Sequence, residues 1–363
     1  MPVSPWSSPA VGSRWPGIIR AYEPYLPFPA QTQIISLNEG NTPLVRADRL
    51  AEAIAPGSRL RLFLKYEGLN PTGSFKDRGM TAAVTQAVRE GSHTIICAST
   101  GNTAASAAAY AARAGIRCLV LVPQGKIALG KLAACLAYGA EVITIDGSFD
   151  DALDMVRAIV ERHPIALVNS INPWRLQGQK TGAFEICDQL GGIAPDWHCL
   201  PVGNAGNITA YWMGYQEYDQ GNPRLLGGQA SGAAPIVQGK VVTHPETIAT
   251  AIRIGNPARW REALAALDES NGIITAVDDE DILQSWRMLA AKEGIFVEPA
   301  SAAGLAALMQ QIESGEIDPT GKTAVCVLTG HGLKDPDTAV RLAPTPHRIL
   351  ASLEALEEYL GKM

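Results

Sequence analysis

The sequence predicts an α/β fold with two lobes, each a mostly parallel twisted sheet flanked by helices. From residue 59 onward, short apolar runs alternate with helical stretches, which is the pattern of βαβ units around a buried parallel sheet. A second series of the same kind begins near residue 174. The 363 residues suit two domains or one large α/β unit, and 47% apolar residues are enough for a large core.

The first series predicts strands and helices in strict alternation up to residue 170. In "RLRLFLKYE" (59–67) every second residue is apolar, as expected of a strand, and a helix follows "NPTGSFKDRG" (70–79). The other strands of this series are expected at 94–99, 118–123, 141–146 and 166–170, with helices at 102–114, 126–138 and 149–162.

The second series is less regular. Residues 220–247 are rich in Gly and Pro and are expected to form loops around short strands, and 346–361 has the spacing of an amphipathic helix. The remaining elements are a helix from about 174 to 190, a helix from 206, and strands at 197–203, 224–230 and 323–330.

Composition excludes several classes of protein. The net charge is −6 without a block of Lys or Arg, which argues against a nucleic-acid partner. No apolar run reaches 18 residues, so no membrane-spanning helix is expected. The six cysteines lack C-x-x-C and zinc-site spacing, which indicates buried reduced thiols, no metal and a cytoplasmic protein.

The stretch "NPTGSFKDRG" places a lysine where its charge is unfavourable. Ser74 and Asp77 have the spacing of a capping box, which predicts that a helix starts here with Lys76 in its first turn. The helix dipole and nearby apolar surface both disfavour an ammonium at this position, so the pKa of Lys76 is expected to be lowered. A neutral amine is what Schiff-base chemistry requires.

Gly-rich and polar segments follow four of the predicted strands, at the edge where ligands bind in open α/β sheets. "PVGNAGN" (201–207) fits a single phosphate but neither dinucleotide nor Walker motifs. "STGNTAAS" (99–106) suits a carboxylate or phosphate and equally a plain capped turn. Arg175 could bind an anion, although spacing alone favours a surface arginine that caps a helix.

These motifs together carry a specific resemblance. "SFKDRG", "STGNTAAS", "PVGNAGN" and "LTGHGLKD" resemble the fold-type II pyridoxal-phosphate enzymes, whose fold is that of the tryptophan synthase β chain. More narrowly, "NEGNTPL", "AIRIGNP" and "GIFVEPASAAG" occur in the same order and are similar to the threonine synthase family. The resemblance runs from about residue 14 to residue 335.

The resemblance implies roles for individual residues. Lys76, beside Phe75, would form the Schiff base with pyridoxal 5'-phosphate, Asn102 would bind the phenolic oxygen of the cofactor, and Thr329 its pyridine nitrogen. The cofactor phosphate would lie on Gly203, Asn204, Ala205, Gly206 and Asn207. The substrate carboxylate would lie on Ser99, Thr100, Gly101, Asn102 and Thr103, and the substrate phosphate on Asn169, Ser170, Arg175 and Asn204.

The activity that the resemblance implies is conversion of O-phospho-L-homoserine and water into L-threonine and phosphate, in a homodimer. Residues 1–74 with 170–363 would form a large cofactor-binding domain, and 75–169 a small, mobile domain that closes on substrate. A threonine or serine dehydratase remains as an alternative, because it needs the lysine and the Gly-rich loops but no second phosphate site. A non-catalytic amino-acid sensor is disfavoured, because a sensor does not need a reactive lysine, and a lyase without cofactor is weaker still.

Overall fold

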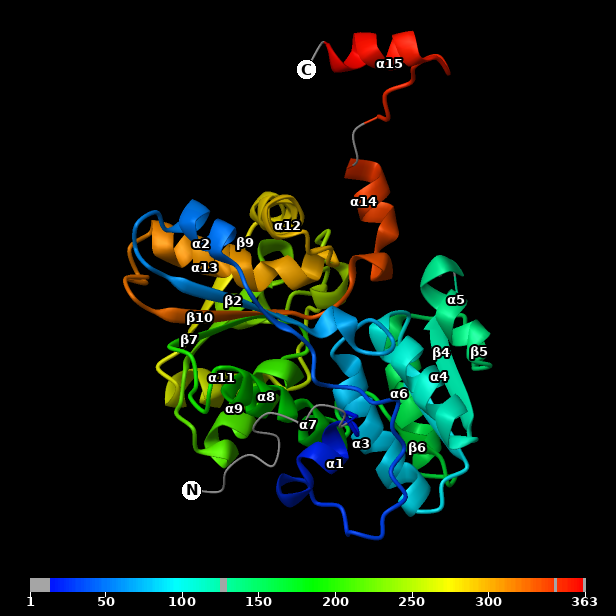
Figure 1. The fold of residues 1–363 in the computed structure, drawn as a ribbon. Helices are drawn as coiled ribbons and strands as arrows, with labels where there is room; N and C mark the ends of the chain where they lie inside the picture. Colours follow the sequence, from blue (N-terminus) through cyan, green and yellow to red (C-terminus); the bar gives the residue numbers. More distant parts are fainter. Residues whose placement is uncertain (1–13, 125–128, 343–344, 362–363) are drawn as a thin grey trace.

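The computed structural model describes residues 14–124, 129–342 and 345–361, which form two α/β lobes side by side (Figure 1). One lobe holds a six-stranded sheet of order β1-β2-β10-β7-β8-β9, and the other a four-stranded sheet of order β5-β4-β3-β6. Neighbouring strands are parallel except for the antiparallel pair β1 and β2. The predicted α/β class with mostly parallel sheets is confirmed.

Each predicted strand is present, and no end differs from the predicted one by more than three residues. Two edge strands, β1 and β9, were not predicted: β1 is three residues long, and four of the five residues of β9 are only partly buried. The strands are β1 (Leu44–Arg46), β2 (Arg61–Tyr66), β3 (Thr94–Ala98), β4 (Arg117–Pro123), β5 (Glu141–Ile145), β6 (Ala166–Leu167), β7 (Trp197–Pro201), β8 (Arg224–Ala230), β9 (Ile273–Val277) and β10 (Thr323–Leu328).

Among the described residues two of the predicted helices differ from the structure, and helices α1, α2, α10, α11, α13 and α14 were not predicted. The helix expected from 174 to 190 is two helices, α7 and α8, and α15 starts only after Ser352, whose side chain caps it. Residues 126–128 of another expected helix lie outside the described residues. The helices are α1 (Ile18–Ala21), α2 (Asp48–Ile54), α3 (Lys76–Arg89), α4 (Asn102–Ala114), α5 (Leu129–Ala137), α6 (Phe149–Val160), α7 (Pro173–Gln179), α8 (Thr181–Gln189), α9 (Gly206–Tyr218), α10 (Pro235–Gln238), α11 (Trp260–Glu269), α12 (Asp279–Glu293), α13 (Ala303–Glu313), α14 (Pro336–Leu342) and α15 (Leu353–Leu360).

Both faces of the larger sheet are covered by helices, as its continuous apolar strands require. Helices α2, α12 and α13 lie on one face, and α8, α9 and α11 on the other (Figure 1). Successive side chains of β10 alternate between these layers: Cys326 and Leu328 pack with the first, whereas Val325 and Val327 pack with the second. In the smaller lobe, α3, α4 and α5 cover one face and α6 the other.

The start of α3 differs from the predicted capping box. No side chain caps this helix, because the carboxylate of Asp77 is already engaged elsewhere. Asp77 accepts hydrogen bonds from the backbone N–H of Thr72 (2.7 Å), from the Thr72 hydroxyl (2.6 Å) and from the Ser106 hydroxyl (2.6 Å). The acid therefore ties the preceding turn and α4 to the helix, and the capping-box interpretation is wrong.

The last two helices extend away from the body of the molecule, with α15 at the tip (Figure 1). None of the described residues of α15 is buried. No helix among the described ranges has the length and apolar character needed to cross a membrane.

Candidate active site

The predicted site residues converge on a cavity with about 670 Å³ of empty space, part of which is open to solvent. Its polar walls come from residues just beyond the carboxyl ends of β3, β6, β7 and β10, as expected for a parallel sheet. The predicted residues that line it are Phe75, Lys76, Asn102, Ser170, Arg175, Gly203, Asn204, Ala205, Gly206, Asn207 and Thr329.

Close packing of α3 on α7 brings two cations to the same wall. A Cβ on Gly178 would lie 1.8 Å from the backbone oxygen of Arg78, so only glycine permits this approach. As a result Lys76 and Arg175 both face the cavity. Burial first, and then the charge of Arg175, lower the pKa of Lys76 to about 7, while Glu298 opposes the shift. A large share of the amine is therefore neutral near pH 7.

Arg175 is buried, so the interpretation as a surface arginine is wrong. Its guanidinium donates to the backbone oxygen of Val168 (3.2 Å), but its Nε has no partner among the described residues. Burial lowers its pKa to about 10. Two other buried polar atoms on this cavity also lack partners within the described ranges, Oε1 of Gln179 and Nδ2 of Asn207. Unsatisfied buried groups of this kind indicate a site for a polar ligand.

The loop after β7 leads into the start of α9 with a backbone shape that suits an anion. Ala205 has a φ of +62°, a left-handed conformation that costs a non-glycine residue free energy and is typical of functional loops. The first N–H groups of α9 have no partners within the helix. A Cβ on Gly206 would meet nothing nearer than a methyl of Leu176 at 3.9 Å, so the space beside these groups is open.

Thr329 also lines the cavity, directly after β10. It is buried, and its hydroxyl is 3.0 Å from the hydroxyl of Ser301. The Ser301 hydroxyl also accepts from the backbone N–H of Gly330 (2.9 Å). The Thr329 oxygen is therefore held in place and can still exchange a hydrogen bond with a ligand.

Asn102, the first residue of α4, does not point its amide freely into the cavity. Its Nδ2 donates to both carboxylate oxygens of Glu298, at 3.0 and 3.1 Å. Glu298 is itself buried, and burial raises the pKa of its carboxyl. An amide that donates to a carboxylate keeps its second N–H and its oxygen for other partners.

Five predicted site residues do not line this cavity: Ser99, Thr100, Gly101, Thr103 and Asn169. Asn169 is buried and exchanges two hydrogen bonds with the backbone of Ala98, at 3.0 and 2.9 Å, so its side chain joins β6 to β3. The Ser99 hydroxyl accepts from the N–H of Gly101 (3.2 Å). A Cβ on Gly101 would meet nothing within 4 Å, which leaves the space beside this loop open.

Two polar residues of the cavity were not singled out from the sequence, Glu298 and Gln179. Glu298 is the single acid in "GIFVEPASAAG" (294–304), and an isolated charge in an apolar run is a usable signal. Gln179 follows Arg175 by four residues, the spacing that places two side chains on one face of a helix.

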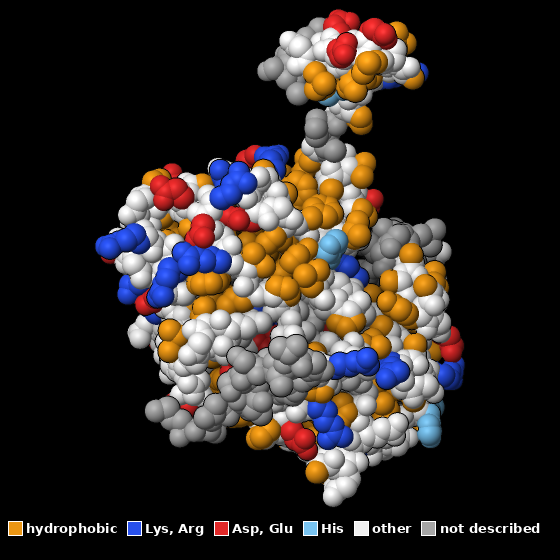
Figure 2. Space-filling view, viewed as in Figure 1, with side chains coloured by type: hydrophobic (Ala, Val, Ile, Leu, Met, Phe, Trp, Pro, Cys, Tyr) orange, Lys and Arg blue, Asp and Glu red, His pale blue; other side chains and the backbone are white. Residues whose placement is uncertain are grey.

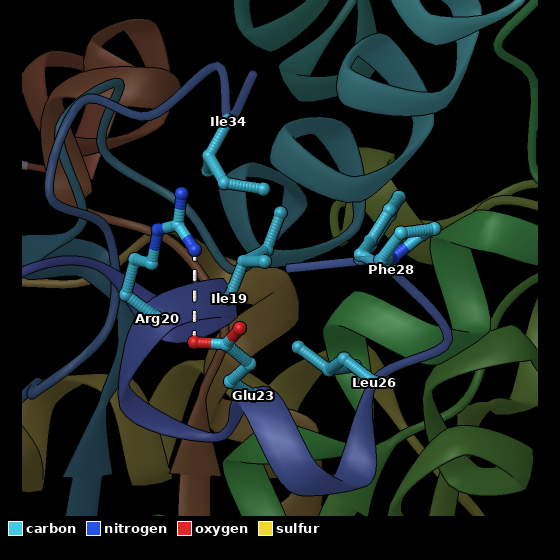
Figure 3. Close-up of a pocket in the computed structure, with 7 residues that line it drawn as sticks. Ile19, Arg20, Glu23, Leu26, Phe28 and Ile34 are labelled. Carbon is cyan, nitrogen blue, oxygen red and sulfur yellow. Dashed lines mark ion pairs between the residues drawn. The ribbon is translucent and has the colours of Figure 1, made fainter. Parts of the chain in front are cut away.

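A second hollow, of about 170 Å³, lies in the N-terminal segment (Figure 3). Its side chains are mainly apolar, including Leu26, Phe28 and Ile34, with one ion pair between Arg20 and Glu23 (3.6 Å) at its edge. It offers no reactive group. Within the described ranges no group of three or more His, Cys, Asp or Glu side chains could hold a metal ion.

Comparisons with known proteins show the family of this chain. Residues 35–330 match the family model described as pyridoxal-phosphate dependent enzyme. The chain is 59% identical to threonine synthase of Synechocystis sp. over 94% of this chain and 88% of that protein. It is 55% identical to threonine synthase of Mycobacterium tuberculosis over 96% of each chain. It is 50% identical to that of Methanocaldococcus jannaschii over 94% of this chain and 87% of that protein.

Solved structures show the same fold at lower identity. A cysteine synthase from Entamoeba histolytica superposes with a TM-score of 0.72 at 22% identity, covering 90% of this chain and 94% of that one. Maize serine racemase superposes with a TM-score of 0.70 at 22% identity, covering 89% and 92%. The two-lobed architecture is thus shared with both of these solved structures.

Proposed function

This chain belongs to the pyridoxal-phosphate-dependent enzymes and, within them, to the threonine synthases, and we propose that the cavity beside Lys76 is its active site. The reaction converts O-phospho-L-homoserine and water into L-threonine and phosphate. One observation carries the assignment of the site: an amine of lowered pKa lies in one cavity with two groups that suit phosphate, Arg175 and the 203–207 loop.

The residues present fit the cofactor. Asn207, whose Nδ2 lacks a partner in the described structure, and the first N–H groups of α9 would hold its phosphate. The amide of Asn102 and the hydroxyl of Thr329 would bind the two polar positions of its ring, with Phe75 alongside. When bound, pyridoxal phosphate supplies an aldehyde for the lysine amine and an electron sink for the substrate's carbon atoms.

Lys76 would act as the acid and base of the reaction. As a neutral amine it takes a proton from carbon, and as an ammonium it returns one, which is efficient for a group with a pKa near the working pH. The ring of Phe75, 4.0 Å from Nζ, shields the amine from water on one side. Exclusion of water protects reactive intermediates from hydrolysis.

A second group of anion-binding side chains in the cavity supports this choice of substrate. Arg175, Ser170 and Asn204 line the cavity beside the cofactor phosphate loop, where they would bind the phosphate of O-phosphohomoserine. Loop 99–103 would bind the substrate carboxylate, and Asn169 would support Ser170 from behind rather than touch the substrate. Threonine and serine carry no phosphate. A dehydratase that acts on them would therefore not need Arg175, a buried arginine without an anionic partner in the described structure.

The test is product formation by the purified protein with pyridoxal phosphate. We expect equal amounts of threonine and phosphate from O-phosphohomoserine, and little 2-oxobutanoate or pyruvate from threonine or serine. Lys76→Ala is the control for adventitious activity. Oxo-acid formation from threonine at a higher kcat/KM would favour the dehydratase, and ligand binding without turnover of any of these would favour a sensor.

We also propose that residues 75–169 move as a small domain against 1–74 and 170–363. The four-stranded sheet comes wholly from the first range, and the strands of the six-stranded sheet come from the second. Asn102 and Lys76 belong to the first range and Arg175, Asn204 and Thr329 to the second, so closure would tighten the site around substrate. Small-angle scattering with and without a substrate analogue would detect the change in dimension.

A homodimer is the assembly that we propose. Apolar side chains are exposed on the arm formed by α14 and α15, including Val340 and Leu350, 76% and 79% exposed, and on Leu333 at its base. Figure 2 shows apolar atoms gathered along this arm and the adjoining body. Exposed apolar patches of this kind mark interaction surfaces. Light scattering of the full chain and of a chain ending at residue 344, which keeps α14 and lacks α15, would show whether the end of the arm contributes.

A cytoplasmic location is consistent with the cysteines. All six are free and buried: Cys97, Cys118, Cys135, Cys187, Cys199 and Cys326. Reduced thiols persist in reducing compartments.

A further inference from the structure

Glu298 lines the cavity and is hydrogen-bonded to Asn102, but it has no role in the function proposed above. It precedes the short 3-10 helix Pro299–Ala302, and its backbone N–H donates to the oxygen of Gly330 (3.1 Å) beside Thr329. A Cβ on Gly330 would come within 2.4 Å of Oε1, so glycine at this position leaves room for the carboxylate. The backbone thus fixes where the acid points.

The carboxylate faces groups from three elements. Both of its oxygens accept from Nδ2 of Asn102 on α4. The positive charges of Lys76 on α3 and Lys334 on the 3-10 helix Gly332–Lys334 favour its ionised form, whereas burial and the nearby Asp335 oppose it. The negative charge of Glu298 raises the pKa of Lys76 and so partly offsets the lowering caused by burial and by the charge of Arg175.

We propose that Glu298 is a positioning residue for the threonine synthase reaction: it orients the amide of Asn102 toward the cofactor ring and tunes the basicity of Lys76 through its charge. The proposal rests on the roles proposed above for Lys76 and Asn102. A merely structural glutamate would stabilise the fold without affecting either group.

Two roles predict two separable effects. Loss of the charge should make Lys76 a weaker base, since a nearby opposite charge favours the ionised form of an amine and shifts its pKa by about one unit or more. Loss of the contact with Asn102 should free that amide to rotate. Cofactor affinity should then fall by about tenfold, the effect of about one hydrogen bond to a charged group.

The experiment compares Glu298→Gln and Glu298→Asp with wild type and with Asp77→Asn. The control removes another buried carboxyl, one residue from Lys76, that does not line the cavity. The readouts are the dissociation constant of pyridoxal phosphate, measured by equilibrium dialysis, and the pH profile of kcat with O-phosphohomoserine, since kcat reports on the substrate complex, in which Lys76 acts as the base. Melting temperatures report on folding.

For Glu298→Gln we expect the acidic limb of the profile to move about one unit toward acid. Glu298→Asp keeps the charge but shortens the side chain, so it should weaken cofactor binding about tenfold and leave the limb in place. Wild-type values for Glu298→Gln in both readouts, or equal shifts in Asp77→Asn, would overturn the proposal. If Glu298→Gln does not fold, unchanged cofactor affinity in Glu298→Asp overturns it. Failure of wild type to make threonine would instead refute the proposed function.

Discussion

Two buried arginines, Arg78 on α3 and Arg175 on α7, lie on facing helices. They differ in the number of hydrogen bonds that they make and in the direction of their pKa shifts. Arg78 donates through all three nitrogens, to Glu67, Glu185, Thr181 and Thr42, and the two carboxylates hold its pKa above the ordinary value. Arg175 has a single backbone acceptor, a partnerless Nε within the described residues and a lowered pKa.

Two lysines, Lys65 on β2 and Lys76 on α3, differ in the same way as the two arginines. Nζ of Lys65 donates to Glu185 (2.8 Å), to Gln189 (2.7 Å) and to the backbone oxygen of Thr42 (2.8 Å). Nζ of Lys76 has no carboxylate partner in the described ranges and lies against the ring of Phe75. A buried charged group whose hydrogen bonds are satisfied within the protein stabilises the fold, whereas one that lacks partners is available to bind a ligand. Each prediction below tests this distinction.

The largest expected effect is on catalysis, in Lys76→Met. We expect kcat to fall about a thousandfold or more, since the variant loses the acid and base of the reaction and the amine that binds the cofactor. The visible absorbance of the bound cofactor should be lost as well. The free energy of unfolding of the cofactor-free protein should not fall, because Nζ makes no hydrogen bond to a described residue that methionine would break. A kcat within tenfold of wild type would contradict the assignment of Lys76.

The same substitution at the other lysine should give the opposite result. Lys65→Met removes one partner of a buried network and should lower the free energy of unfolding by about 3 kcal/mol, measured by denaturant titration. Activity per folded molecule should change little, because Lys65 does not line the cavity. If Lys65→Met were as stable as wild type, the network would be dispensable and the contrast between the two lysines would not hold.

These contrasts explain what could be predicted from the sequence. Apolar alternation is local, so it revealed the two α/β series and the loops at the ends of the strands. The burial of Arg175 depends on how closely α3 approaches α7 at Gly178, a contact between residues about a hundred positions apart. The same holds for Asp77, which meets Ser106 only in the folded chain. Asn169, predicted to bind substrate, instead bonds to Ala98 across the sheet.

Arg175→Met tests the second half of the arginine contrast. We expect kcat/KM for O-phosphohomoserine to fall by about 10- to 100-fold, the usual effect of losing hydrogen bonds between charged groups. The unfolding midpoint of the protein without ligands should stay level or rise, because a buried donor without a partner is removed while side-chain volume is kept.

Arg175→Lys is the matched control for charge. It should recover only part of the activity, because an ammonium cannot reproduce the fork of the guanidinium. Unchanged turnover in Arg175→Met would mean that the substrate phosphate binds elsewhere. A stability loss as large as that of Lys65→Met would mean that Arg175 is structural after all.

The smallest effect is a pH dependence of stability that belongs to Lys76 alone. In the cofactor-free protein its pKa is about 7, below the ordinary value of 10.5 that it regains on unfolding. Between these values the unfolded chain binds more protons, so stability should rise with pH, by at most about 1.4 kcal/mol per pH unit. Other groups titrate in this window, but they cancel in the difference between wild type and Lys76→Met. That difference should increase from pH 7 to 9 and be nearly constant below pH 6. A difference that stays flat from pH 6 to 9 would mean that burial does not lower the pKa of Lys76. Lys76 and Lys65 would then differ only in their hydrogen-bond partners.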